Sequence, residues 1–230
     1  MLLENAFEAA GFAISEIPKT DWVAKVKREL SPVEAGRFFV FGKHDFKKLP
    51  KDKVGLLIEA SMAFGTGHHG TTKGCLLALN NLIEKGKKID DVIDVGCGTA
   101  VLAIAVAKVS SSRVIASDMD QVAVEVALAN LKANKLENRI ACFQATGFEH
   151  TQIKSNAPFD LIFANILKLP LIDLAPSIRK NLKSNGHAII SGILDAQAVE
   201  IIEVYLQHKL KVLDRIDIDE WVTFTLISSE

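Results

Sequence analysis

Short apolar runs and amphipathic stretches alternate along the chain from Asp91 onward. Strands that are apolar at every position are buried on both faces, which is typical of parallel sheets covered by crossover helices. The alternation therefore predicts repeated strand-helix units. The expected strands are Val92–Val95, Val114–Ser117, Ile140–Phe143, Leu161–Ala164 and Ala188–Ser191, and the expected helices are Ala100–Lys108, Asp120–Lys132, Leu171–Leu182 and Gln197–His208.

The C-terminal end breaks this alternation. Leu210–Ile218 and Trp221–Ile227 both have strand-like patterns, and only Asp219-Glu220 separates them. Two residues are too few for a crossover helix, so these strands are expected to be antiparallel. The predicted fold is α/β, with a doubly wound, mostly parallel sheet and an antiparallel strand near one end.

The composition limits the class of protein further. A hydrophobic content of 49% and a net charge of −1 exclude a disordered chain and provide no strong basic surface for nucleic acid. The cysteines Cys75, Cys97 and Cys142 are far apart, which argues against a disulfide framework and against zinc. The start of the chain has no signal-peptide pattern, and no apolar run is long enough to span a bilayer. We expect a cytoplasmic protein without a metal, a membrane partner or direct nucleic-acid binding.

The strongest motif is the glycine-rich turn that follows Val92–Val95. Gly96 and Gly98 permit positive φ angles and a close ligand approach, and the following helix provides free N–H groups. Asp118 comes 22 residues after Gly96, at the end of the next expected strand. A carboxylate in that place can accept both ribose hydroxyls of a nucleoside, so the motif indicates a nucleoside cofactor.

The details of this turn favour S-adenosylmethionine. A dinucleotide fingerprint would need a third glycine where Val101 stands. Asp94 precedes the turn, and an acid there suits a sulfonium and an ammonium group better than a pyrophosphate. The sequence from Asp94 to Ala100 resembles motif I of class I methyltransferases, which implies a seven-stranded sheet; Ala100 replaces the usual last glycine. A nicotinamide-dependent oxidoreductase is the less favoured alternative.

Asn165 stands at the end of the apolar run that includes Leu161–Ala164. Ligands of open α/β sheets bind at the carboxyl ends of the strands. A carboxamide oxygen there can accept an N–H bond from an amine and orient its lone pair toward a methyl group. Asn165 is therefore a candidate catalytic residue for methyl transfer to nitrogen; the alternative is an asparagine that caps the next helix or forms a turn.

A stretch rich in glycine and threonine, residues 63–72, precedes an expected helix, Lys73–Leu82. Thr71 or Thr72 is expected to cap this helix. The pair His68-His69 has no further ligand-type residue at a suitable spacing, which argues against a metal site.

Together these motifs resemble those of the ribosomal protein L11 methyltransferases. The resemblance runs from about Asp21 to the C-terminus, and its discriminating element is the Phe-Gly-Thr-Gly-x-His segment. The matching segments, in the order of the family, are Phe64–His68, Thr71-Thr72, Asp94–Ala100, Ser117–Asp120, Ala164–Leu167 and Ser191–Leu194.

The resemblance implies an S-adenosylmethionine-dependent N-methyltransferase that acts on α-amino and lysine ε-amino groups of ribosomal protein L11. It implies that Asn165 and Thr71 lie where the methyl group is transferred. The sequence shows no strong base; His68 is a candidate proton acceptor, and solvent is the alternative. With the two turn residues Asp94 and Gly98 included, the candidate cofactor-binding residues are Phe64, Gly65, Thr66, Gly67, Thr72, Asp94, Gly96, Gly98, Asp118 and Asn165.

The sequence departs from the family in two places. Gln144–Gly147 lacks the acid that many class I enzymes use near adenine, so backbone groups near Thr146-Gly147 are expected to serve instead. Only 20 residues precede Asp21, which is too few for the N-terminal domain that grips L11 in the family. The expected division is therefore a linker or extension over residues 1–60 and a methyltransferase domain over residues 61–230. Two further alternatives stay open: another protein amine as substrate, or a cofactor-binding chain without L11 activity.

Overall fold

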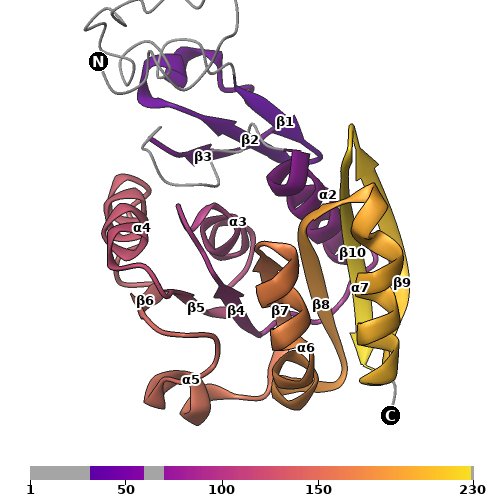
Figure 1. Cartoon of the computed structure of the whole chain (residues 1–230). Helices are drawn as coiled ribbons and strands as arrows, with labels where there is room; N and C mark the ends of the chain where they lie inside the picture. The colour runs from indigo at the N-terminus through magenta and orange to yellow at the C-terminus, as the bar shows by residue number, and fades with distance from the viewer. Residues whose placement is uncertain (1–31, 60–69, 229–230) are drawn as a thin grey trace, which may run out of the picture.

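The structure is a computed structural model that describes residues 32–59 and 70–228 (Figure 1). The predictions for Phe64, Gly65, Thr66, Gly67 and His68, and for the first 31 residues, lie outside the described residues. Within the described part, two sheets are present, one of seven strands and one of three.

The large sheet has the strand order β6-β5-β4-β7-β8-β10-β9. The first five strands in this order are parallel, whereas β10 runs antiparallel to both β8 and β9. This confirms the predicted doubly wound sheet with an antiparallel strand near one end. The strands are β4 (Asp91–Val95), β5 (Arg113–Asp118), β6 (Ile140–Gln144), β7 (Phe159–Asn165), β8 (Leu182–Leu194), β9 (Leu210–Ile218) and β10 (Trp221–Ser228).

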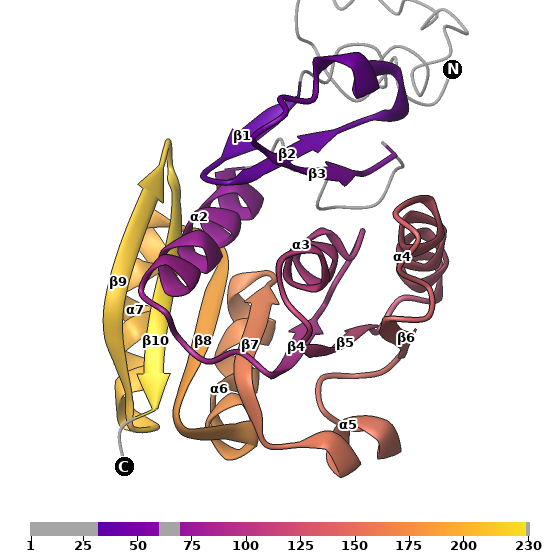
Figure 2. The same ribbon diagram turned by 180° about the vertical axis from the view of Figure 1, so that it is seen from behind.

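Helices cover both faces of this sheet, and alternate residues of each strand point into two different cores. Val92 belongs to the core under α2, α3 and α4, whereas Ile93 belongs to the core under α5, α6 and α7. In Figure 1 the helices α6 and α7 lie in front of the sheet, and in Figure 2 α2 does. The helices are α2 (Gly70–Glu84), α3 (Val101–Val109), α4 (Gln121–Ala133), α5 (Thr151–Asn156), α6 (Lys168–Asn181) and α7 (Asp195–Gln207).

Three local features differ from expectation. Helix α2 already includes Gly70, so Thr71 and Thr72 lie inside its first turn and the predicted capping role is wrong. Strand β8 has 13 residues and extends well beyond Ala188–Ser191, because it pairs with β7 from Leu182 onward and with β10 up to Leu194. The short helix α5 was not expected at all.

The small sheet consists of β1 (Val33–Ala35), β2 (Phe38–Phe41) and β3 (Val54–Leu57). In Figure 1 it lies above the large sheet. β1 and β2 are antiparallel, and β2 and β3 are parallel. Phe38, Val40 and Leu56 belong to the same hydrophobic core as α2 and α3, so this sheet is packed against the large domain. A 3-10 helix, Lys43–Lys48, lies between β2 and β3.

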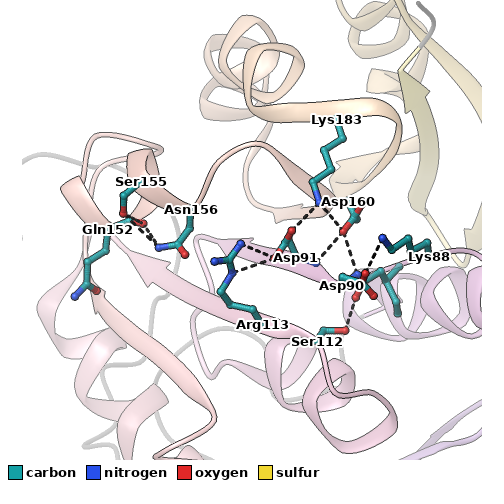
Figure 3. A network of polar contacts seen from close by, with 11 residues as sticks. Lys88, Asp90, Asp91, Ser112, Arg113, Gln152, Ser155, Asn156, Asp160 and Lys183 are labelled. Carbon is teal, nitrogen blue, oxygen red and sulfur yellow. Dashed lines mark hydrogen bonds and ion pairs between the residues drawn. The ribbon is translucent and has the colours of Figure 1, made fainter.

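Charged side chains link the amino ends of four neighbouring strands of the large sheet (Figure 3). Lys183 of β8 contacts Asp91 of β4 at 2.6 Å and Asp160 of β7 at 3.0 Å. Arg113 of β5 contacts Asp91 at 2.6 Å. Asp160 also accepts the backbone N–H groups of Asp90 and Asp91. These contacts fix the spacing of β5, β4, β7 and β8 at the end opposite to the carboxyl ends.

Within the described ranges, no helix is long and apolar enough to cross a membrane. The same residues contain no group of three or more histidine, cysteine or acidic side chains arranged to hold a metal ion.

Candidate active site

The direction in which successive strands are added to the sheet reverses between β4 and β7. These strands lie side by side, with Val95 paired to Ala164, so the loops that follow them diverge from neighbouring points. Such a reversal opens a crevice at the carboxyl ends of the strands, where ligands of open α/β sheets bind. Gly96 follows β4, and Asn165 ends β7.

The turn after β4 is held against the end of β5. The N–H groups of Gly96 and Cys97 both donate to the carbonyl oxygen of Ser117, at 2.8 and 3.0 Å. The N–H group of Gly98 donates to Oδ2 of Asp118 at 2.9 Å. The structure thus brings together three residues that were predicted from their spacing: Gly96, Gly98 and Asp118.

Gly96 is required by its backbone and by a neighbouring side chain. Its φ angle is +70°, and a Cβ atom there would lie 2.4 Å from Cγ2 of Ile166. Ala100, which stands where the family has glycine, has a φ of 60° and precedes α3. An alanine in this left-handed conformation costs about 1–2 kcal/mol, which explains why glycine is usual in this place.

Asp118 keeps acceptor capacity toward the crevice. Oδ2 accepts Gly98 N–H, and Oδ1 accepts the N–H of Asp120 at 3.0 Å. An ionised carboxylate offers about four lone-pair positions, so these two bonds leave room for two hydroxyl donors. The side chain therefore fits the ribose diol of a nucleoside.

Asp94 is buried below the turn, with 1% of its surface exposed. Its Oδ2 accepts the N–H of Ala103, one of the N-terminal donors of α3 that have no partner inside the helix. Burial raises the pKa of Asp94 to about 7, although the hydrogen bond from Ala103 acts in the opposite direction. A bound cation would favour the ionised form of this carboxyl group.

Asn165 and Thr72 meet across the crevice, from β7 and α2. Nδ2 of Asn165 donates to Oγ1 of Thr72 at 3.4 Å, and Thr72 is fully buried. Oδ1 of Asn165 accepts no hydrogen bond from the residues that the structure describes. Asn165 does not cap α6, whose capping residue is Leu167. Thr71, the other predicted catalytic residue, is buried one position earlier on α2.

A group of small and hydroxyl side chains below Asn165 was missed in the sequence. Ser191 pairs with Asn165 in the sheet, and its hydroxyl is 2.8 Å from that of Thr223. A Cβ atom on Gly74 would lie 2.2 Å from Oγ1 of Thr223, so only glycine lets α2 approach β10 this closely. This packing brings Thr72 to Asn165. The strand-like alternation of Trp221–Ile227 predicts only that Thr223 lies on the face opposite to Val222 and Phe224, so it gave no signal for this contact.

The arrangement of strands and site residues defines the class of protein. A seven-stranded sheet with one reversed strand next to its edge carries a glycine turn after β4, an acid at the end of β5 and an asparagine at the end of β7. The protein is a class I S-adenosylmethionine-dependent methyltransferase.

The comparison with known sequences identifies the family. The sequence model of "Ribosomal protein L11 methyltransferase (PrmA)" matches residues 2–228, so the chain belongs to this family. The ribosomal protein L11 methyltransferase of Caulobacter sp. (strain K31) is 43% identical over 221 residues, which are 94% of this chain and 76% of the relative. That of Agrobacterium fabrum is 41% identical over 225 residues, 98% of this chain and 77% of the relative.

Solved structures show the same fold. The crystal structure of ribosomal protein L11 methylase from Lactobacillus delbrueckii subsp. bulgaricus has a TM-score of 0.75 at 24% identity and covers 87% of this chain and 100% of its own. An S-adenosylmethionine-dependent methyltransferase from Clostridium acetobutylicum has a TM-score of 0.55 at 17% identity and covers 68% of this chain and 91% of its own. The predicted fold class and cofactor are thus confirmed.

Proposed function

We propose that this chain transfers methyl groups from S-adenosylmethionine to α-amino and lysine ε-amino groups of ribosomal protein L11, with Asn165 as the catalytic residue. The observation that carries the proposal is the position of Asn165 at the reversal point of the sheet. Its amide nitrogen donates to Thr72, and its Oδ1 accepts no hydrogen bond from the described part of the chain, so this oxygen can accept one from a substrate amine. The curated relatives at 41–43% identity bear the name of this activity.

The chemistry asks the protein mainly to orient a neutral amine. S-adenosylmethionine supplies an electrophilic methyl group on a sulfonium. A lysine ε-amino group has an ordinary pKa of about 10.4, so the nucleophile must lose a proton before it can react. Oδ1 of Asn165 accepts an N–H bond from the neutral amine and directs the nitrogen lone pair into the crevice. The hydrogen bond to Thr72 keeps the amide in the orientation that presents Oδ1.

The cofactor residues divide the ligand between them. Gly96 and Gly98 leave room for the methionyl and ribose part of S-adenosylmethionine. The carboxylate of Asp118 binds the ribose hydroxyls, and Asp94 stabilises the positive charges of the cofactor. On the strength of the resemblance, Thr71 acts beside Asn165. By the same resemblance, we assign Phe64, Gly65, Thr66 and Gly67 to cofactor binding.

The working context follows from the same proposal. We assign the methyltransferase domain to residues 61–230 and an N-terminal extension to residues 1–60, whose three-stranded sheet packs onto that domain. The enzyme acts in the cytoplasm on a protein partner and has no direct contact with nucleic acid.

Methylation of purified L11 by the variant Asn165→Ala tests the catalytic role. We expect kcat to fall about 100-fold, because the amine loses its orienting acceptor. Calorimetric affinity for S-adenosylhomocysteine should fall much less than kcat, because the glycine turn and Asp118 are untouched. Asn181→Ala is the matched control: this asparagine also makes one amide hydrogen bond, to Ser177, but on α6 away from the crevice.

The outcomes separate the alternatives. Full activity of Asn165→Ala with normal cofactor affinity would overturn the catalytic role. Binding of S-adenosylhomocysteine by the wild type without any methylation of L11, followed by mass spectrometry, would favour another protein amine or a cofactor-binding chain. Binding of NAD instead would favour the oxidoreductase.

A further inference from the structure

Asn130 of α4 is a buried amide that connects two distant segments of the chain. Only 2% of its surface is exposed. Its Nδ2 donates to the carbonyl oxygen of Thr99 at 3.1 Å, and its Oδ1 accepts the N–H of Glu59 at 3.2 Å. Buried side-chain amides are costly unless they are satisfied, so these two bonds hold the side chain in one place.

Asn134, one helical turn further on, contacts only one of these segments. Its Oδ1 accepts the N–H of Leu57 at 3.2 Å, and its Nδ2 donates to the carbonyl oxygen of Leu57 at 2.7 Å. Leu57 and Glu59 are two residues apart, as are successive residues on one side of a strand. The two asparagines therefore bind the free edge at the end of β3 much as a neighbouring strand would. Figures 1 and 2 both show the end of β3 beside α4.

Thr99 belongs to the glycine-rich turn after β4, residues 96–100, which is called the cofactor turn below. The first half of this turn is held from the sheet side, by the bonds from Gly96 and Cys97 to Ser117 and from Gly98 to Asp118. The bond from Asn130 holds the other half, next to the left-handed Ala100. Asn130 is thus the side chain that joins the cofactor turn to the small sheet.

We propose that Asn130 is a positioning residue that makes the shape of the cofactor turn depend on the docking of the small sheet β1-β2-β3. The inference rests on the cofactor role of the turn proposed above, and it gives the N-terminal sheet a part in cofactor binding. Because such coupling is reciprocal, cofactor binding must in turn stabilise the end of β3 against opening.

The variants Asn130→Asp and Asn134→Asp test this coupling. Each keeps an oxygen that accepts the N–H of β3 and replaces the donating NH2 by an oxygen. In Asn130→Asp that oxygen faces the carbonyl of Thr99. In Asn134→Asp it faces the carbonyls of Leu57 and of Asn130 and leaves the bond to Thr99 in place. We expect both variants to melt at a lower temperature. Only Asn130→Asp should bind S-adenosylhomocysteine about tenfold more weakly. Asn134→Asp should stay within about twofold of the wild type, because Asn130 still joins the turn to the docked sheet.

Hydrogen exchange on the wild type gives a second test that needs no variant. We expect saturating S-adenosylhomocysteine to slow exchange of the Glu59 amide by about the same tenfold factor. The amide of Lys154, which is bonded within α5, serves as a control and should be unaffected.

Two results would overturn the proposal: equal cofactor affinity of Asn130→Asp and Asn134→Asp, or a Glu59 amide whose exchange the ligand does not change. Neither measurement involves L11. A failure of the proposed L11 activity is therefore distinguishable from a failure of this coupling.

Discussion

The two ends of the large sheet are built from the same strands but by opposite means. At the amino ends of β4, β5, β7 and β8, charged side chains satisfy one another, with Asp91 and Asp160 both bound to Lys183 (Figure 3). At the carboxyl ends of β4 and β8, backbone turns with positive φ angles occur at Gly96, Ala100 and Gly192.

This difference separates stability from function. The polar groups of the amino ends have their partners within the protein, so those ends fix the spacing of the strands. At the carboxyl ends, Asn165 and Asp118 keep acceptor capacity that the fold does not use, and Ala100 adopts a left-handed conformation that is strained for an alanine. The amino ends therefore fix the strand spacing, which in turn positions the side chains of Asn165 and Asp118 at the carboxyl ends.

The largest expected effect comes from Gly192→Ala, which disturbs the backbone at the carboxyl ends of β7 and β8. Gly192 has a φ of +91°, and a Cβ atom there would lie 2.1 Å from the carbonyl oxygen and 2.7 Å from the carbonyl carbon of Ile166. Ile166 must shift, and it carries Asn165 with it. A displacement of about 1 Å at a reacting group can cost 100-fold, so we expect kcat on L11 to fall by about that factor.

Gly86→Ala is the control for this prediction. Gly86 also has a positive φ, +65°, but a Cβ atom there would meet nothing within 4 Å. It reproduces the backbone strain without the collision, and kcat should stay near that of the wild type. Similar kcat values for both variants would show that the carboxyl ends tolerate displacement, and the contrast between the two ends would weaken.

Asp160→Ala, a substitution at the amino ends, should affect stability alone. It removes the acceptor of two backbone N–H groups and a partner of Lys183. We expect the free energy of unfolding in urea to fall by about 2 kcal/mol, because bonds to a charged group are lost and two donors are left unpaired. The kinetic constants on L11 should not change.

Lys88→Met is the control for Asp160→Ala, because it removes an ion pair at the same end of the sheet. The pair that Lys88 forms with Asp90 is exposed on both sides, so the unfolding midpoint should stay where it is. A fall in kcat of Asp160→Ala at a temperature where it is fully folded would contradict the separation of stability from function.

The fold was predictable because its main signals are local. Apolar runs such as Leu161–Ala164 reported strands buried on both faces, and the two-residue gap at Asp219-Glu220 fixed the reversed strand. The ends of elements were less predictable. Helix α2 includes Gly70 although threonines suggested a later start, and α5 has six residues with only Ile153 buried, too few for a periodic pattern.

The positions of the candidate site residues were predictable where spacing along the chain matched neighbouring strand ends, as for Gly96, Asp118 and Asn165. Parallel strands place their carboxyl ends together, so residues that end successive strands are expected to meet. Asn130 carried no such signal, because its partners Thr99 and Glu59 lie 31 and 71 residues away in the sequence. Contacts of this kind depend on how α4 and β3 pack, which no local pattern encodes.

The smallest predicted effect compares two acids on one strand, Asp91 and Asp94. Burial raises the pKa of Asp91, but the hydrogen bonds from Lys183 and Arg113 outweigh it, so this pKa is lower than usual. Asp94 is more deeply buried and has no such cationic partner among the residues that the structure describes, and its pKa rises to about 7. The pKa values of the two acids of β4 are therefore shifted in opposite directions, down for Asp91 and up for Asp94.

The sign of each contribution follows from proton linkage. For Asp94 the folded pKa exceeds the unfolded value of 3.8, so the folded protein holds an extra proton between about pH 4 and pH 7. The free energy of unfolding should fall as the pH rises through this window and level off above it. Asp91 has a lowered folded pKa, so its stabilising contribution is full above the unfolded value and is lost only in stronger acid.

Cofactor affinity should report the same titration with the opposite sign. The positive charges of S-adenosylmethionine favour ionised Asp94, so affinity is expected to rise about fivefold between pH 6 and pH 8, an effect of about 1 kcal/mol. Calorimetry at several pH values measures it, and the rise should be smaller for S-adenosylhomocysteine, which lacks the sulfonium charge. Asp94→Asn should abolish the rise because the amide does not titrate. If Asp94→Asn kept the same pH dependence of affinity, ionisation of Asp94 would not contribute to cofactor binding.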